Sequence, residues 1–440
     1  MTSTKITNAS SSNYGPLIPE GYIPRLADSL VASALKSFGA VEITGARWTG
    51  KSWTARAFGS SVTQVDTNPS LYMDDPELAL LGDSPHILDE WQDAPALWNR
   101  VRHRIDDKAN RPGQFILTGS STPPMDDERH TGAGRIARVR MHTMSMAETG
   151  VSDMTVSLAG LFEGQFEPAQ CSLSLLDVAG IIAKGTWPAL IGRSGASETS
   201  NVANEYLEAF FEVSIPKAGK SPTLARSIAR SLARNTAASA TLQTIAADAS
   251  EGEDSILSTQ TISSYLDIFQ RNFLITPLHG WAPPLKSASR IRTKPKRYFD
   301  DPSLAATLLG ASSDRIAQDG QVFGNLFENL AIHELATYAP LIPRAGHNPL
   351  SYYSDADDLE VDVIIELLDG RWAGIEIKLG ESKLEQGVRN LQRLRKKVTA
   401  NPLARVRPPE FMAVLVGHGE YARYLADEDI YVIPIGTLGP

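Results

Sequence analysis

The feature that most limits how this chain can fold is an eight-residue segment, GARWTGKS, at positions 45–52. Residues 41–44, Val-Glu-Ile-Thr, have strand character, and residues 52–58 are rich in helix formers. A glycine-rich turn between a strand and a helix presents backbone N–H groups to an anion without side chains in the way. The flanking strand and helix argue against a chance glycine-rich turn and favour a phosphate-binding loop, or P-loop.

The residues of this loop fit a nucleoside triphosphate with magnesium. The ammonium of Lys51 would contact the β- and γ-phosphates, and the hydroxyl of Ser52 would ligate Mg²⁺. The expected cofactors are therefore ATP and Mg²⁺. The residues predicted to bind the nucleotide are Gly45, Ala46, Arg47, Trp48, Thr49, Gly50, Lys51, Ser52 and Trp53.

A second apolar strand, residues 86–88, ends in two acids, Asp89 and Glu90. Asp89 would hold the magnesium ion through water, and Glu90 would polarise the water that attacks the γ-phosphate. Alone, such a pair is equally well explained as a helix N-cap with a favourable dipole interaction. Beside a P-loop, catalysis is the better interpretation.

A third strand, residues 114–117, ends in Thr118-Gly119-Ser120-Ser121. Thr118 or Ser120 would hydrogen-bond the γ-phosphate or the attacking water, and a solvent-exposed Ser/Thr turn is an equally good alternative. Strands that alternate with helical stretches, such as residues 96–105, predict a parallel α/β sheet. Ligands of such sheets bind at the carboxyl ends of the strands, where these polar residues lie.

After about residue 150 the pattern becomes mostly helical, and residues 216–222 have the composition of a linker. A helix near residue 223 would carry an arginine stripe, Arg226, Arg230 and Arg234, at i, i+4 and i+8. A second helix and the apolar residues 273–275 follow, which together predict a winged helix-turn-helix.

The last part of the chain predicts a second α/β domain with a candidate acidic site. Asp362 lies on one predicted strand, Glu376 and Lys378 share a face of the next, and Glu328 lies on a preceding helix. This set resembles the PD-(D/E)xK nuclease core, in which acids bind Mg²⁺ and the lysine positions or activates water. The Pro-Asp element is missing, because Glu360-Val361 precede Asp362. A partly buried salt bridge is the alternative that we favour.

Several longer motifs extend these features to a family resemblance. They are ILDEWQDAP, FILTGSS and GRIARVRMHTMSMAE after the P-loop, and TISSYLDIFQRNFLI, PKRYFDDPSLAATLLG and FENLAIHEL further on. From about Gly21 the chain resembles the AAA-type ATPases of bacteria and archaea that carry a C-terminal domain of unknown function. The resemblance implies ATP binding and hydrolysis. It also implies that Arg135, in the Gly-Arg pair, reaches a γ-phosphate as an arginine finger, although we favour a salt bridge distant from the phosphates.

These observations predict an α/β chain built on a P-loop NTPase parallel sheet, with a helical lid, a winged-helix-like module and a C-terminal α/β domain like a restriction endonuclease. About two to four domains are expected for 440 residues. The predicted partition is a disordered tail over 1–20, an AAA-type ATP-binding domain over 21–150, the lid over 151–215, the winged-helix-like module over 216–298 and the nuclease-like domain over 299–440.

Charge and composition narrow the choice of partner and compartment. The net charge of −9 argues against coating nucleic acid by bulk charge, but local basic segments remain, at residues 286–297 and on one later stretch. That stretch contains Arg389, Arg393, Arg395, Lys396 and Lys397. One cysteine, a polar start and no long apolar run favour a cytoplasmic protein without a membrane partner.

The expected function is Mg-dependent ATP binding and hydrolysis coupled to a nucleic-acid or protein partner, in a chain that forms a homo-oligomer. Two alternatives stay open: an ATP-dependent nuclease, and a nucleotide-gated DNA-binding protein with little turnover. Runs of charge are most often solvated faces, so no single basic segment decides between them.

Overall fold

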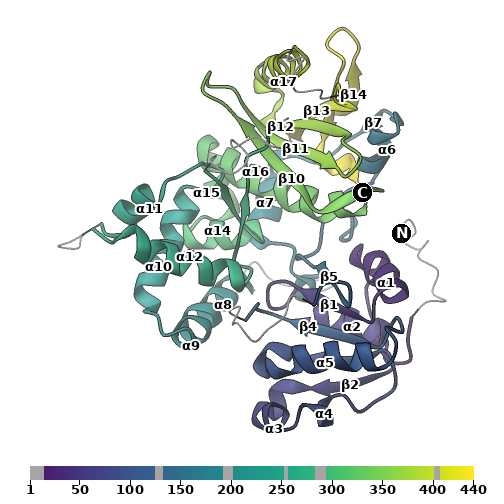
Figure 1. Ribbon diagram of the computed structural model, residues 1–440. Coiled ribbons are helices and arrows are strands. Elements are labelled where there is room, and N and C mark those ends of the chain that lie inside the picture. The colour runs from purple at the N-terminus through teal and green to yellow at the C-terminus, as the bar shows by residue number, and fades with distance from the viewer. Residues whose placement is uncertain (1–13, 124–131, 192–201, 252–255, 283–293, 401–406) are drawn as a thin grey trace. The chain divides into compact units, whose positions relative to one another are not determined.

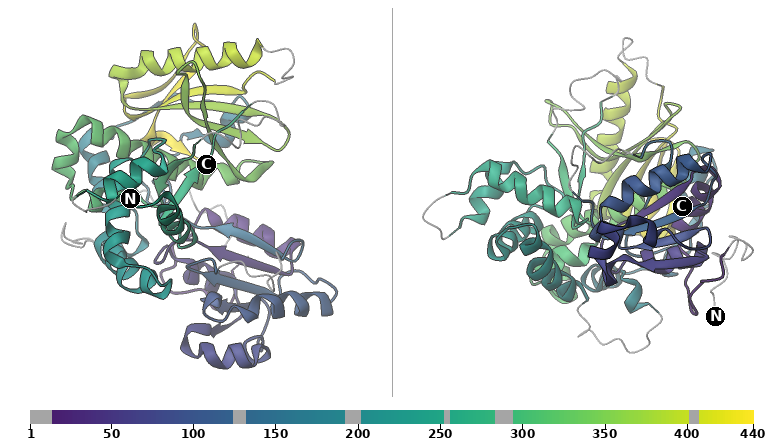
Figure 2. Two further views of the ribbon diagram at one scale, coloured as in Figure 1. Left: turned by 60° about the vertical axis from the view of Figure 1, so that its left-hand side comes forward. Right: turned by 60° about the horizontal axis from the view of Figure 1, so that its bottom comes forward.

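The computed structural model of the chain contains two compact units (Figures 1 and 2). The first unit holds the described residues up to Met144 together with Trp187–Ala189 and Arg271–Leu274, and the second holds the remainder. Most of the predicted N-terminal tail and of the basic segment 286–297 lies outside the described residues. The structure describes residues 14–123, 132–191, 202–251, 256–282, 294–400 and 407–440.

The first unit is built on a five-stranded sheet in the order β2-β3-β4-β1-β5, in which every pair of neighbours is parallel. The predicted parallel α/β sheet is therefore confirmed. Its strands are β1 (Ala40–Thr44), β2 (Ser61–Gln64), β3 (His86–Asp89), β4 (Phe115–Gly119) and β5 (Ile136–Arg140). Its helices are α1 (Ala27–Ser37), α2 (Lys51–Phe58), α3 (Pro69–Asp74), α4 (Pro76–Ala79) and α5 (Ala96–Asp107), with 3-10 turns η2 (Val65–Thr67) and η3 (Trp91–Asp93).

Helices cover both faces of this sheet, so its central strands carry apolar residues on both sides. On one face Val41 and Ile43 of β1 pack against α1 and α2, through Val31 and Ala55 among others. On the other face Leu117 and its neighbours pack against α5. Strand β1 is buried at all five positions. The sheet is thus a rigid base for the loops that leave its edge.

The second unit is built on a seven-stranded mixed sheet in the order β10-β11-β12-β13-β15-β14-β7. Helix α17 packs on it through Leu391, Leu394 and Val398, which enter the same core as Trp372 and Val414. The strands of this unit are β6 (Val156–Ser157), β7 (Ala169–Gln170), β8 (Ile275–Leu278), β9 (Lys296–Phe299), β10 (Ala345–Ser354), β11 (Glu360–Leu367), β12 (Trp372–Gly380), β13 (Phe411–His418), β14 (Tyr421–Leu425), β15 (Ile430–Pro434) and β16 (Leu438–Gly439).

The helices of the second unit surround this sheet and form a separate cluster around α10 (Figure 1). They are α6 (Leu158–Phe162), α7 (Leu175–Lys184), α8 (Val202–Ala209), α9 (Ile215–Lys217), α10 (Pro222–Arg234), α11 (Leu242–Ala249), α12 (Thr259–Arg271), α14 (Pro302–Leu308), α15 (Ser313–Gln318), α16 (Gly320–Tyr338) and α17 (Leu384–Thr399), with the π-helical turn η5 (Phe210–Ser214). None of the helices among the described residues is long and apolar enough to cross a membrane.

The predicted winged-helix-like module corresponds to α10, α11 and α12 followed by the antiparallel pair β8 and β9. The expected linker before it is the short helix α9 and a turn. Ser221 ends this turn and caps α10, because its side chain accepts a hydrogen bond from the N–H of Leu224. Three helices and a two-stranded sheet suit a winged helix, and that assignment stays a prediction.

The structure differs from the predicted partition in the segment 151–215, expected as a helical lid. Strand β7 of this segment pairs with β14 at the edge of the seven-stranded sheet, and β6 pairs with β16. Residues 145–186 therefore fold with the C-terminal strands. Strands of two residues leave no alternating pattern in a sequence, so the helical character of the surrounding residues dominated the prediction.

Replacing Leu391 by Ala should lower the free energy of opening of β12 by about 2–5 kcal/mol, because the truncation leaves a cavity between α17 and the sheet. Hydrogen exchange of the β12 amides in the full chain measures this energy. Gln392→Ala, an exposed change on the same helix, is the control and should shift it by less than about 0.5 kcal/mol. Equal effects of the two substitutions would contradict the described packing of α17.

Candidate active site

Parallel pairing brings the ends of three strands to one edge of the five-stranded sheet. Thr44, the last residue of β1, pairs with Gly119 of β4, and Leu88 of β3 pairs with Leu117. The loops that follow β1, β3 and β4 therefore leave the sheet side by side. They carry the P-loop, the acidic pair and the Thr/Ser group predicted from the sequence.

The P-loop has a backbone that requires its two glycines. Gly45 has a φ of +150°, and a Cβ there would lie 2.0 Å from the carbonyl oxygen of Met141. Gly50 has a φ of +96° and is the residue before the first turn of α2. Any other residue at either position would be strained. Between them, Trp48 also has a positive φ and leaves 46% of its surface exposed.

Side chains of the P-loop bond back to the loop itself. The ammonium of Lys51 donates to the carbonyl oxygen of Ala46 at 2.7 Å, and the hydroxyl of Thr49 donates to the same oxygen at 3.0 Å. Lys51 is buried although it is charged. Lys51 is also the first residue of α2, so its ammonium lies beside the positive end of the helix dipole. Both groups favour the binding of a triphosphate at this loop.

The two predicted magnesium ligands lie in contact. The hydroxyl of Ser52 donates to Oδ1 of Asp89 at 2.8 Å, and the hydroxyl of Thr118 donates to the same oxygen. Hydroxyl and carboxylate oxygens are the hard ligands that Mg²⁺ prefers. The residues present therefore fit a magnesium ion held between α2 and β3.

Glu90 turns away from Asp89 toward the end of β4. Its backbone is left-handed, with a φ of +56°, and its N–H donates to the Thr118 hydroxyl at 3.1 Å. Its carboxylate accepts hydrogen bonds from Ser120 at 2.8 Å and from the side-chain amide of Gln92. Thr118 and Ser120, which the sequence left as alternatives, thus donate their hydroxyls to the carboxylates of different acids. Gln92 was missed, because its proximity to Glu90 depends on the turn η3.

Arg135 lies at the amino-terminal ends of the strands, whereas the P-loop follows the carboxyl end of β1. The carbonyl of Arg135 accepts from the N–H of Ala40, at the start of β1, so the length of the strand, roughly 16 Å, separates it from Gly45. Its side chain pairs with Asp106 at 2.9 Å. The favoured alternative, a salt bridge distant from the phosphates, describes this contact, and a role as an arginine finger at the P-loop of another subunit stays a prediction. The arginine of β5 at the P-loop edge is Arg140, which pairs in register with Thr44.

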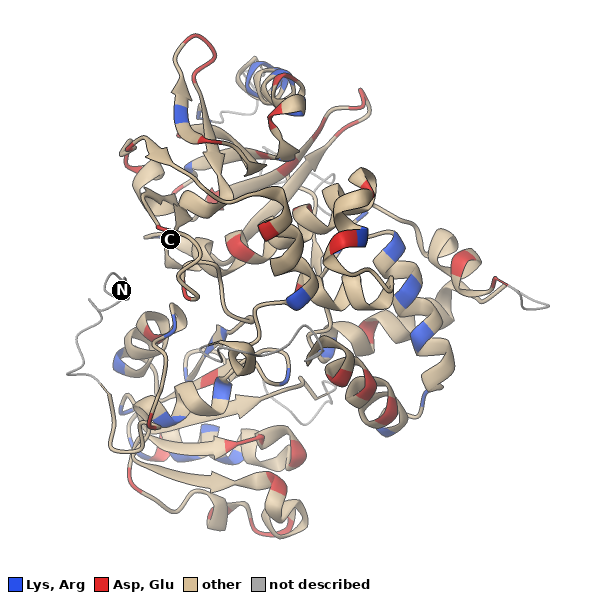
Figure 3. Cartoon of the chain, turned by 180° about the vertical axis from the view of Figure 1, so that it is seen from behind, with Lys and Arg blue, Asp and Glu red and all other residues tan. Residues whose placement is uncertain are grey.

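The predicted arginine stripe on α10 is largely matched by acids of the same unit. Arg226 makes two hydrogen bonds of 2.7 Å with Glu208 and a third with Glu212. Arg234 lies 3.4 Å from Glu251. In the view of Figure 3, basic and acidic segments are interspersed on both units.

The basic group of α17 has a similar arrangement. Lys397 lies 2.6 Å from Asp355, and Arg395 lies 3.1 Å from Asp429. Arg389 lies 3.4 Å from Glu385, on the same helix. These pairs reduce the charge that either segment offers to a phosphate backbone, and nucleic-acid binding stays a prediction.

The acidic site of the second unit is built around a lysine that the sequence analysis did not single out. Nζ of Lys296, on β9, lies 2.6 Å from Glu360 and 3.1 Å from Glu328. It lies 3.6 Å from Asp362. The tyrosine two residues further on, Tyr298, donates its hydroxyl to Glu328 at 2.6 Å. The sequence analysis included Lys296 only in the basic segment 286–297 and not in this site, because its partners come from α16 and β11.

A second lysine completes this cluster. Lys378 contacts the carboxylate of Glu376 and lies 3.3 Å from Asp362. Asp362 also accepts a hydrogen bond from the N–H of Ile377 at 2.8 Å, and Glu376 accepts one from Asn390 at 3.0 Å. The structure thus brings together Asp362, Glu376 and Lys378, and Lys296 links them to Glu328.

The carboxyl groups of this cluster have shifted acidities. Burial and the charge of Asp362 raise the pKa of Glu376 to about 8 and that of Glu328 to about 7. Asp362 is buried too, but the charges of Lys378 and Lys296 hold its pKa below the usual value.

This arrangement fits a charge-neutralised core better than a metal centre. Each ammonium lies between carboxylates of the cluster. Across the described parts of the chain, no group of three or more His, Cys, Asp or Glu residues is arranged to hold a metal ion. The salt-bridge alternative accounts for these contacts, and nuclease activity stays a prediction.

Comparison with protein families gives three matches. Residues 37–150 match the family model described as an AAA domain. Residues 323–438 match a domain of unknown function, DUF4143, and residues 176–315 match another, DUF8612. No curated protein matches the chain. The AAA match covers the sheet and all three loops of the nucleotide site.

Solved structures give more distant likenesses. A Walker-type ATPase of Pyrococcus abyssi is 12% identical over 67% of this chain and 97% of its own, with a TM-score of 0.42. The replication initiator DnaA bound to AMPPCP and single-stranded DNA is 15% identical over 59% and 91%, with a TM-score of 0.27. AMPPCP-bound DnaA of Aquifex aeolicus is 15% identical over 57% and 89%, also with a TM-score of 0.27.

The raised pKa of Glu376 predicts how stability depends on pH. The folded chain holds this proton more tightly than the unfolded chain, whose carboxyl has the ordinary pKa of 4.5. The free energy of unfolding should therefore fall as pH rises from about 4.5 to about 8, by up to about 1.4 kcal/mol for each pH unit. The lowered pKa of Asp362 acts below this window.

Glu376→Gln should reduce that slope, because an amide does not titrate, and the part that remains comes from Glu328, whose pKa is raised to about 7. The measurement is the opening free energy of β11 and β12 from hydrogen exchange at pH 5 and pH 8, corrected for intrinsic exchange rates. Glu385→Gln, on the exposed side of α17, is the control and should keep the parent slope. If Glu376→Gln and the parent lose stability equally over this range, Glu376 is not the titrating group.

Proposed function

Because the chain carries an AAA-type P-loop ATPase domain and a C-terminal DUF4143 domain, we propose that it binds ATP through residues 45–53 and hydrolyses it with Mg²⁺. The observation that carries this proposal is the contact of Ser52 with Asp89 at the carboxyl edge of the parallel sheet. One residue comes from the P-loop and the other from a different strand. A chance glycine-rich turn would not be expected to meet an acid in this way.

Each side chain of the site has a distinct role in this proposal. Backbone N–H groups between Gly45 and Gly50 hold the phosphates, and Lys51 places its ammonium on the terminal ones. Ser52 and Asp89 hold the magnesium ion, which neutralises charge on the phosphates when it is bound. Thr118, which donates to the same oxygen of Asp89, positions that carboxylate.

Glu90 is the proposed general base. Its carboxylate is oriented by hydrogen bonds from Ser120 and Gln92, so it occupies one fixed direction rather than many rotamers. A carboxylate held in this way can accept a proton from a water molecule that attacks the γ-phosphate. Ser120 and Gln92 hydrogen-bond the carboxylate of Glu90, whereas the hydroxyl of Thr118 donates to Asp89.

The proposed hydrolysis is coupled to a protein or nucleic-acid partner. The module formed by α10, α11, α12, β8 and β9 is the part that would bind DNA if it is a winged helix. Because Arg226 and Arg234 already pair with acids, such binding would have to displace those pairs or use other residues. A protein partner requires no such displacement.

Lys51→Ala should weaken ATP binding at least about tenfold, because it removes the full positive charge from the P-loop. Titration of the full chain with ATP and Mg²⁺ by calorimetry measures the affinity. Lys36→Ala, an exposed lysine on α1, is the control and should leave it unchanged. Unaltered affinity in Lys51→Ala would refute the P-loop assignment.

Glu90→Gln should keep ATP binding and slow hydrolysis by about 10²–10⁴-fold, since the amide is nearly isosteric with the acid but cannot accept the proton. Steady-state phosphate release gives kcat, and the same titration gives the affinity. Asp107→Asn, on the exposed end of α5, serves as the matched control. If turnover is undiminished in Glu90→Gln, Glu90 is only a cap of the turn that follows β3.

A further inference from the structure

A buried arginine before the AAA domain match contacts the P-loop. Arg25 is 7% exposed and lies upstream of residue 37, where the family match begins. Its Nη1 donates to the carbonyl oxygen of Thr49 at 2.6 Å. Its Nη2 donates to the carbonyl oxygens of His142 and Thr143 at 3.0 and 3.3 Å. One side chain thus joins the P-loop to the segment that follows β5.

These acceptors explain why an arginine is needed here. A guanidinium carries donors in a rigid planar fork, so two of its nitrogens can serve separated acceptors at fixed angles. A lysine has one nitrogen and could keep the charge but not both contacts. Thr49 is also tied to Ala46 through its hydroxyl. The guanidinium therefore acts on a P-loop residue whose position is already defined.

The position of Arg25 is fixed by a buried carboxylate. Oδ2 of Asp28, a residue that is 2% exposed, accepts a hydrogen bond from the N–H of Arg25 at 3.0 Å. Tyr14 and Tyr22 donate their hydroxyls to the same carboxylate at 2.9 and 2.6 Å. The hydroxyl of Tyr22 also lies 2.9 Å from that of Thr54, on the P-loop helix α2. The segment from Tyr14 to Asp28 is thus part of the P-loop's own framework.

The segment after β5 is held at the same edge of the sheet. The N–H of Met141 donates to the carbonyl oxygen of Thr44 at 2.7 Å, directly before the P-loop. The carbonyl of Met141 is the group that leaves no room for a side chain at Gly45. Residues 141–143 therefore contact the start of the P-loop directly and its later part through Arg25.

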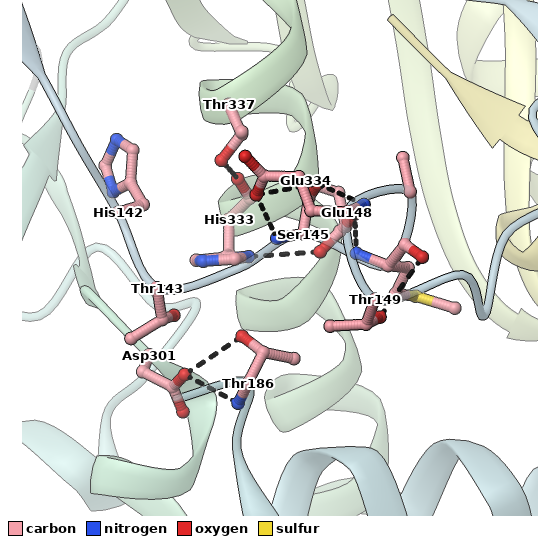
Figure 4. A network of polar contacts seen from close by, with 12 residues as sticks. His142, Thr143, Ser145, Glu148, Thr149, Thr186, Asp301, His333, Glu334 and Thr337 are labelled. Atoms are coloured by element: carbon pink, nitrogen blue, oxygen red, sulfur yellow. Dashed lines mark hydrogen bonds and ion pairs between the residues drawn. The ribbon is translucent and has the colours of Figure 1, made fainter. Parts of the chain in front are cut away.

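The chain after this segment is anchored in the second unit. The N–H of Met146 donates to Glu334 of α16 at 2.9 Å, and the N–H of Ala147 donates to the hydroxyl of Tyr338 at 3.2 Å. Figure 4 shows Glu334 directed toward the turn that contains Ser145 and Glu148. Within that turn the N–H of Ser145 donates to Glu148 at 2.8 Å. Met144 and Ser145 separate Thr143, which accepts from Arg25, from Met146, which donates to α16.

We propose that Arg25 is a positioning residue of the ATP site that couples the P-loop to residues 142–148, and this role rests on the proposed function. Nucleotide binding orders the P-loop around the phosphates. Arg25 donates hydrogen bonds both to the carbonyl of Thr49 and to the carbonyls of residues 142–143. Ordering of the P-loop therefore stabilises residues 142–143 as well. The turn at residues 145–148 continues from that segment and carries the effect to α16. The effect is a coupling free energy between nucleotide binding and the order of this segment.

Hydrogen exchange of the full chain, with and without a non-hydrolysable ATP analogue and Mg²⁺, tests this role. In the parent, the analogue should slow exchange in both the P-loop and residues 141–148. Arg25→Lys keeps the charge, so at saturating analogue it should keep P-loop protection while protection of residues 141–148 falls about tenfold, a typical coupling. Tyr22→Phe, which loosens the support of Arg25 without removing it, should show a smaller loss in the same direction. Arg111→Lys, an exposed arginine of the same unit, should behave like the parent.

The outcomes separate the two proposals. If the parent shows P-loop protection and Arg25→Lys protects residues 141–148 as fully as the parent does, Arg25 has no coupling role. If Arg25→Lys does not fold, an unchanged pattern in Tyr22→Phe overturns the role in its place. If the parent shows no protection of the P-loop, the proposed function fails first and the role of Arg25 fails with it.

Discussion

Parallel hydrogen bonding between β1, β4 and β3 is the constraint on which the candidate site depends. The register that pairs Thr44 with Gly119 sets the P-loop, the acidic pair and the Thr/Ser group at one level. A slip of one residue would turn every side chain of the slipped strand to the other face and separate Asp89 from Ser52. Val41 and Ile43, which face α1 and α2, hold this register, because a slip of one residue would turn the carboxylate of Glu42, now bonded to Trp91 and Arg138 on the other face, into the core that Ile43 fills. The packing of the sheet therefore determines the geometry of the site.

The two charged clusters of the chain solve the problem of buried charge differently. At the nucleotide site, Asp89 is satisfied by the hydroxyls of Ser52 and Thr118, which are neutral and can exchange a carboxylate for another oxygen ligand at little cost. In the second unit, Lys296 and Lys378 neutralise the carboxylates with full charges, and removing either partner would leave an uncompensated buried charge. The arrangement around Asp89 is therefore suited to binding a ligand. The lysine–carboxylate cluster is suited to a fixed structural role.

The sequence predicted what is local and missed what depends on topology. The P-loop, Asp89 and Glu90 are each read from a strand and the residues that follow it, and their convergence follows from a parallel sheet. The role of Arg135 was taken from a family motif. The structure shows that Arg135 directly precedes β5, at the end of the strand that is far from the P-loop. The roles of Lys296 and Arg25 were not predicted, because their side-chain partners lie tens of residues or more away in the chain. The two-residue strands β6 and β7 are too short for any periodicity. The charge pairs that occupy Arg226 and Lys397 depend on neighbouring helices and loops that a linear charge pattern does not specify.

The exposed indoles beside the P-loop have an optical consequence. Of the seven tryptophans, Trp48 in the loop and Trp53 on the first turn of α2 are 46% and 49% exposed, whereas Trp91, Trp98, Trp187, Trp281 and Trp372 are each at most 4% exposed. An aqueous quencher such as iodide would reach these two rings and leave the emission of the buried five nearly unchanged. The quenchable fraction of the intrinsic fluorescence therefore reports on the surroundings of a single loop, and the unmodified chain carries its own spectroscopic probe at the phosphate-binding edge.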